Sequence, residues 1–139
     1  MRRWKELLSV YETMLPNFLA EDAVRKENGQ SPAVDISGNA GAPLLITLGI
    51  TRIVEQESLD VEIQGSADGQ TWQPKALAEF PQKFYCGTYS IILDLSATPE
   101  VAFLRATWKM NRWGRGDTKA SFGFFVFAEP AGAAVATSA

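Results

Sequence analysis

The sequence predicts an all-β protein, an antiparallel β-sandwich with jelly-roll-like topology and about eight strands, together with a short N-terminal amphipathic helix or arm. Three observations predict this fold class. Short segments alternate apolar and polar side chains, which is the pattern of half-buried strands. Turn-forming residues separate these segments, and no long helical pattern lies between them, so alternating βα units are not expected. A jelly roll also accommodates the long connections near residues 74–87 and 111–120.

The clearest signal is the segment 59–72, LDVEIQGSADGQTW. Its first six residues alternate apolar with polar side chains, so one face of the strand is apolar and the other faces water. Residues 65–69 contain two glycines and Asp68, which allow the positive backbone torsions of a tight reversal. We expect Trp72 to cover the end of the apolar layer.

Further strands are expected along the rest of the chain, at residues 33–36, 43–54, 72–80, 87–95, 101–110 and 121–128. Prolines interrupt the segment 72–80, which suits an edge strand. The segment 17–27 fits either an edge strand or a continued helix. Asn28-Gly29 is a turn signal.

The 139 residues suffice for one domain of ordinary size. Apolar residues recur at helical spacing before Pro16, which ends that pattern. We therefore divide the chain into an N-terminal amphipathic segment (1–16), a β-sandwich domain (17–129) and a flexible C-terminal tail of small residues (130–139).

The composition argues against most catalytic chemistry. The sequence has no histidine and a single cysteine, Cys86, so the commonest general base and the usual metal ligands are missing. Cys86 lies between aromatic residues, and we expect a buried, inert thiol. Acidic residues near 55–60 are interpreted as a solvated polar turn rather than a calcium site. We expect no enzyme activity, no cofactor and no metal site.

Charge and hydropathy restrict the partners and the location. The net charge is −3 and no basic run is present, so neither nucleic acid nor an anionic membrane is an expected partner. No segment approaches the roughly 20 apolar residues of a membrane span. Charged residues interrupt the N-terminal apolar positions, so no signal-peptide core is evident. We predict a cytoplasmic or virion location.

The loop 111–117 is the best candidate binding surface. Arg112, Trp113 and Arg115 lie there among glycines, and they provide a flat apolar ring together with planar, multiply donating cations. Such a ring also suits stacking on a sugar. In the alternative interpretation, Trp113 only caps the sandwich and the arginines are solvated.

The last expected strand, residues 121–128, is apolar on both faces. Phe125 and Phe127 point opposite to its other large side chains, whereas a strand of a two-layer sandwich normally has one wet face. Either the N-terminal segment covers Phe125 and Phe127, which we favour slightly, or another subunit does.

Residues 61–72, VEIQGSADGQTW, resemble the strand and turn of discoidin-like, galactose-binding-type sandwiches and of β-sandwich decoration (cement) proteins on tailed-phage capsids. The phage proteins continue with a YLR-V type strand and a closing aromatic strand. Similar segments here are AVDIS (33–37), FLRAT (103–107) and FGFFV (122–126). The likeness covers roughly residues 17–128. The chain departs from discoidin domains in lacking their frequent cysteine pair, and from a plain decoration domain in its N-terminal segment.

The resemblance implies a binding or structural role and carries over no catalytic residue. The preferred hypothesis is a non-catalytic protein that self-associates or joins a larger assembly, such as a phage-derived capsid decoration protein. The alternative is a discoidin-like carbohydrate-binding module. Assembly predicts apolar residues at a subunit contact, whereas sugar binding predicts an open aromatic surface beside polar loops.

Overall fold

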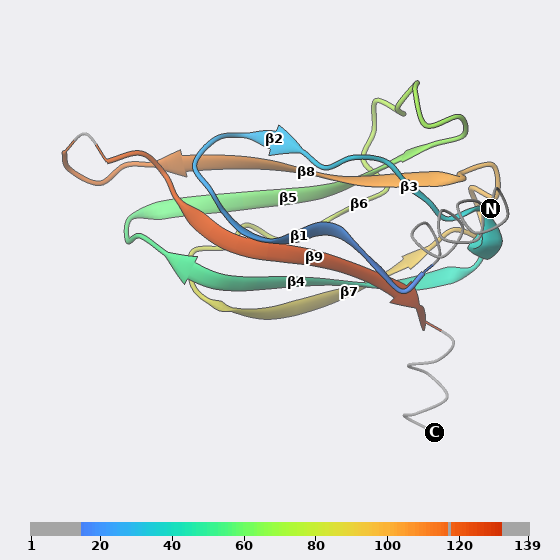
Figure 1. Cartoon of the computed structure of the whole chain (residues 1–139), viewed down its shortest axis with the longest axis horizontal. Helices are drawn as coiled ribbons and strands as arrows, with labels where there is room; N and C mark the ends of the chain where they lie inside the picture. Colours follow the sequence, from blue (N-terminus) through green and yellow to red (C-terminus); the bar gives the residue numbers. More distant parts are fainter. Residues whose placement is uncertain (1–14, 117, 132–139) are drawn as a thin grey trace, which may run out of the picture.

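The computed structural model describes residues 15–116 and 118–131, which form two antiparallel sheets packed face to face (Figure 1). The predicted β-sandwich is therefore confirmed. The described residues contain a short 3-10 turn, η1 (Ser37–Asn39), and nine strands: β1 (Asn17–Arg25), β2 (Gly29–Gln30), β3 (Val34–Asp35), β4 (Pro43–Ile53), β5 (Glu57–Ser66), β6 (Ala78–Glu79), β7 (Gly87–Asp94), β8 (Phe103–Arg112) and β9 (Phe122–Pro130).

The strand order confirms the jelly roll. The four-stranded sheet has the order β1-β9-β4-β7, and the five-stranded sheet has the order β2-β8-β5-β6, with β3 also paired to β8. β2 and β3 thus act as one interrupted strand. The chain passes repeatedly from one sheet to the other, which is the double Greek-key path of an eight-position jelly roll.

The core lies between the sheets and consists of every second side chain. On β4, Leu44, Ile46 and Leu48 are fully buried and face inward. Fully buried partners come from the neighbouring β9 and from the opposite sheet: Phe122, Phe124, Val126, Leu59, Ile63 and Leu104. Apolar alternation in the sequence therefore predicted the inward face correctly.

Several strand boundaries differ from the prediction. β1 resolves the ambiguous segment 17–27 as an edge strand paired with β9. β6 is only two residues long, because prolines on both sides restrict the pairing expected over 72–80. β8 begins and ends about two residues later than expected. The expected turn at Asn28-Gly29 contains the start of β2, and the Asn28 side chain accepts a hydrogen bond from the Met110 amide (2.7 Å).

The reversal after β5 forms as predicted, but its two glycines have different roles. Gly69 has φ +78°, the left-handed conformation that a turn requires. Gly65 instead lies within β5, where a Cβ atom would come within 2.5 Å of Leu77. Trp72, which we expected to cover the end of the apolar layer, is half-buried and is not part of the core; the Arg105 guanidinium lies 4.2 Å from its ring centroid.

The ends of the sandwich domain differ slightly from the sequence-based division. Pro130 belongs to β9 and pairs with Leu44, and Ala131 is buried. The expected amphipathic segment up to residue 14 and the tail from residue 132 lie outside the described residues. None of the helices described is long and apolar enough to cross a membrane.

Candidate functional site

Three connections meet at one end of the sandwich, at the left of Figure 1: the β4–β5 turn, the β6–β7 connection and the β8–β9 loop. The Trp113 amide donates a hydrogen bond to the Gln56 carbonyl (3.0 Å), which joins the β8–β9 loop to the β4–β5 turn. The rings of Phe84 and Trp113 are 6.1 Å apart between centroids, which joins the β6–β7 connection to the same loop. The predicted loop 111–117 is therefore one part of a composite surface.

Phe84, Tyr85 and Trp113 form what we call the aromatic platform. Their exposed fractions are 40%, 70% and 57%. Phe84 lies between the other two rings, at interplanar angles of 72° to Trp113 and 53° to Tyr85. Sequence analysis identified Trp113 but missed Phe84 and Tyr85. The available signal was the adjacent aromatic pair Phe84-Tyr85 in the connection that follows Pro81.

A hollow of about 280 Å³ lies beside the aromatic platform and is also lined by Glu55, Gln56 and Glu57. The Glu55 carboxylate and the Tyr85 hydroxyl have no hydrogen-bond or ion-pair partner within the described part of the chain. The hollow therefore combines exposed ring surface with polar groups that are available to a ligand.

Glu57 corrects the interpretation of residues 55–60 as a solvated turn. Its side chain is only 1% exposed, and its carboxylate accepts hydrogen bonds from the amides of Val54 (2.8 Å) and Ser121 (2.7 Å). One buried carboxylate therefore fixes the β4–β5 turn to the start of β9, and both lie next to the aromatic platform.

The two arginines of the predicted site have different surroundings. Arg112 donates from Nη1 to the carbonyls of Thr118 (3.0 Å) and Arg115 (3.3 Å), so its guanidinium closes its own loop. Its Nε is buried and has no hydrogen-bond partner among the described residues. The Arg115 side chain is exposed. Neither arginine lines the hollow.

Cys86 follows the aromatic platform directly in sequence. It is exposed, so the expectation of a buried thiol was wrong. Cys86 is the last residue of the loop before β7, which begins at Gly87.

Phe125 and Phe127 lie on the outer face of the four-stranded sheet, as their alternation predicted. They belong to what we call the apolar band: Phe18, Leu45, Ile92, Phe125 and Phe127. The Phe18 ring packs edge-on against Phe127 (4.9 Å between centroids) and Phe125 (5.8 Å). Part of the apolar surface is thus covered by β1, although Phe18 is itself 40% exposed and Ile92 is 57% exposed.

Gly49 on β4 makes room for the apolar band. A Cβ atom at this position would lie 2.2 Å from the Phe125 ring, so that ring must lie across the glycine. The Phe125 ring therefore lies over the backbone of residue 49, in the space that a side chain there would need.

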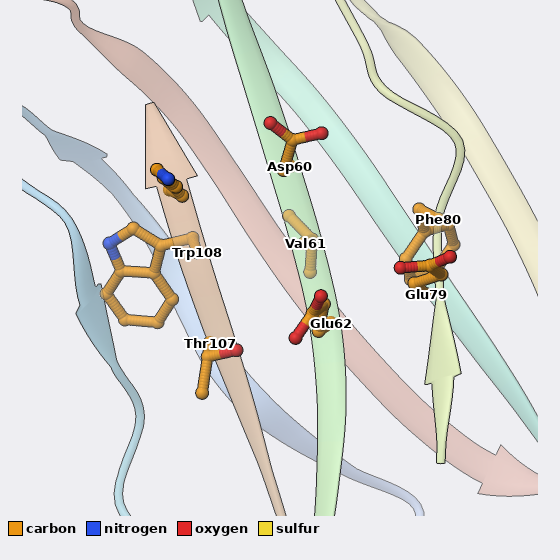
Figure 2. Close-up of a pocket in the computed structure, with 8 residues that line it drawn as sticks. Asp60, Val61, Glu62, Glu79, Phe80, Thr107 and Trp108 are labelled. Carbon is orange, nitrogen blue, oxygen red and sulfur yellow. The ribbon is translucent and has the colours of Figure 1, made fainter. Parts of the chain in front are cut away.

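The outer face of the five-stranded sheet is polar. A hollow of about 270 Å³ lies on this face. Among the residues that line it, Figure 2 shows Asp60 and Glu62 on β5 and Glu79 on the adjacent β6. The Asp60 carboxylate accepts a hydrogen bond from the side-chain amide Nε2 of Gln82 (3.0 Å). The described residues contain no group of three or more acidic, histidine or cysteine side chains suited to hold a metal ion. This face therefore has the wet character that is usual for a sandwich.

No protein-family model and no curated protein matches this sequence. Solved structures with a similar fold include infectious bursal disease virus of the Gt strain (TM-score 0.51, 13% identity) and of the Gx strain (TM-score 0.50, 15% identity). The VP2 subviral particle of that virus is also similar (TM-score 0.51, 13% identity). The alignments cover 83–85% of this chain and 31–34% of the viral chains.

The chain thus spans about a third of the length of these viral chains. At such low identity the likeness concerns the fold alone. It shows a β-sandwich similar to those of these viral chains. This agrees, for the fold, with the predicted resemblance to virus-associated β-sandwiches. It does not test the discoidin-like motif.

Proposed function

We propose that this protein is a non-catalytic structural β-sandwich that assembles with other protein surfaces through the apolar band. The assembly is built either from copies of this chain or on a larger particle, as in a phage-derived capsid decoration protein. The proposal rests on one observation: among the described residues, large apolar side chains are exposed on only one of the two outer faces. The most exposed apolar side chains of that sheet are Ile92, Val24 and Phe18.

The apolar band gives a physical reason for association. Removing apolar surface from water contributes about 25 cal/mol per Å², from which the entropic and desolvation costs of association are subtracted. Ile92, Leu45 and Phe127 lie on three adjacent strands of one sheet, so a flat partner can cover them together. The Phe125 ring lies over Gly49. The side chains are therefore arranged for contact with an extended surface rather than for enclosing a small ligand.

The opposite polar face favours one-sided assembly. A protein that lies on a particle needs one face for the particle and another that remains in water. The carboxylates around Glu62 and Glu79 suit the latter role. The likeness to viral capsid folds supports this proposal at the level of architecture, and the histidine-free sequence supports a role without acid–base catalysis.

Sedimentation velocity of the full chain over a wide concentration range tests the proposal, together with co-sedimentation on purified tailed-phage capsids. We expect concentration-dependent mass or uptake onto capsids, and Ile92→Glu should weaken it by about tenfold or more, since a charge would be buried in the contact. Thr107→Glu, on the polar face, is the matched control and should leave association unchanged. A strict monomer at high concentration that shows no uptake onto capsids would contradict the proposal.

A further inference from the structure

We propose that the aromatic platform and its hollow form a binding site for a neutral sugar, separate from the apolar band. This inference does not depend on the assembly proposal, because the two surfaces share no residue. The ligand class follows from the ring surfaces, the polar groups and the charge of the site.

The rings provide two surfaces that meet at an angle. Trp113 and Phe84 are inclined at 72° to each other, and Tyr85 is the most exposed of the three rings. A pyranose ring has one face of C–H bonds, which are weakly positive and pack on the negative face of an aromatic ring. Trp113 and Tyr85 can each support such a face, while Phe84 fixes the position of both.

The polar groups match sugar hydroxyls. The Glu55 carboxylate accepts hydrogen bonds, the Gln56 amide both donates and accepts, and the Tyr85 hydroxyl does both. Sugar hydroxyls are themselves donors and acceptors, so they can satisfy this mixed set. The backbone of Gln56 has φ +63°. Its position is fixed because its backbone carbonyl accepts a hydrogen bond from the Trp113 amide.

The charge of the site disfavours anionic ligands. The nearest guanidinium, Arg112, is occupied by the carbonyls of its own loop. The Lys83 ammonium packs on the Tyr89 ring, 3.9 Å from its centroid, and is not among the residues that line the hollow. The acidic side chains lining the hollow are Glu55 and Glu57, of which Glu57 is buried and already bonded. An anionic ligand in the hollow would be repelled by the Glu55 carboxylate, whereas a neutral ligand would not.

The size of the hollow limits the ligand. Ligand pockets usually span about 300–1,000 Å³, so a hollow of about 280 Å³ suits one sugar ring, with further rings extending over Tyr85 into solvent. Such an open site predicts weak binding, with a dissociation constant on the order of millimolar for a single sugar.

Saturation-transfer difference NMR on the full chain tests this inference. The probes are methyl glycosides of glucose, galactose, mannose and N-acetylglucosamine at millimolar concentration, with glucose 6-phosphate and choline as charged comparisons. We expect transfer to at least one neutral glycoside, strongest at the protons of one ring face. Calorimetric titration then measures its affinity.

Variants decide whether the platform is responsible. Trp113→Ala and Tyr85→Ala should each weaken the sugar by about tenfold, and Glu55→Ala by a smaller factor. Phe18→Ala removes a similarly exposed ring from the apolar band and should leave sugar binding unchanged; circular dichroism checks that each variant folds. Three outcomes would overturn the inference: no transfer to any neutral glycoside, binding of only choline or the phosphate, or sugar binding that survives Trp113→Ala and Tyr85→Ala combined.

Discussion

The two outer faces of this sandwich differ although both follow the same strand alternation. The outer positions of β5 and β8 carry acids, amides and bases such as Glu62 and Lys109, as expected for a solvated sheet. The outer positions of β9, β4 and β7 carry Phe127, Leu45 and Ile92. Fold stability requires only the inner face to be apolar, so an apolar outer face points to a second requirement, which we attribute to contact with another protein.

The largest expected effect concerns Gly49, which distinguishes the apolar outer face from the polar one. Gly49→Val should lower the free energy of unfolding by about 1–3 kcal/mol, because its side chain would occupy the space of the Phe125 ring. Chemical denaturation measures this. Gly38→Ala is the matched control, since a Cβ atom there meets nothing within 4 Å, and its effect should be close to zero. Equal effects at both positions would mean that Phe125 does not need the glycine.

A smaller effect is expected on the polar face. Glu62 and Glu79 are directly opposed in the β5–β6 ladder, where like charges destabilise the pair. Glu79→Lys should therefore raise the free energy of unfolding by about 0.2–1 kcal/mol at low salt. The gain should shrink as salt screens the pair. A gain that is independent of salt would show that charge is not its cause.

The smallest expected effect is the pH dependence of stability that comes from Asp68, a residue outside the apolar band. Asp68, in the turn after β5, accepts hydrogen bonds from the amides of Thr71 and Gln70, which lower its pKa to about 2. Because the folded pKa is below the unfolded value of about 3.9, the ionised turn is favoured above pH 4, and this contribution is lost as the pH falls towards 2. Side-chain carboxyl NMR should give this pKa, and Asp68→Asn should remove the dependence.

The five side chains of the apolar band do not titrate. Association through this surface should therefore keep its strength while Asp68 is protonated, provided that the sandwich remains folded. Dissociation that follows the Asp68 titration would link the two regions and contradict their separation.

Much of the fold could be predicted because alternation is a local property of the sequence. Residues 59–64 and 43–54 carry the inward face in their own pattern, and the long connections pointed to the jelly roll. Pairing partners are not local. The short β2 has no pattern of its own and forms only because β8 provides a partner.

The candidate site was predicted only in part for the same reason. Trp113 could be noticed because its glycine-rich loop has no structural need for a large ring. Phe84 lies 29 positions earlier, and nothing local shows that the two rings meet. Glu57 looked solvated because a carboxylate beside other acids usually is. Its burial depends on two amides, one of them from the distant Ser121.

The exposed Cys86 has a practical consequence. It is the sole thiol of the sequence, and it lies next to Tyr85. A fluorophore coupled to it through a maleimide would mark a single known position without any engineered substitution. Such a label would report changes around the three aromatic rings. The opposite end of the sandwich and the apolar band would carry no dye.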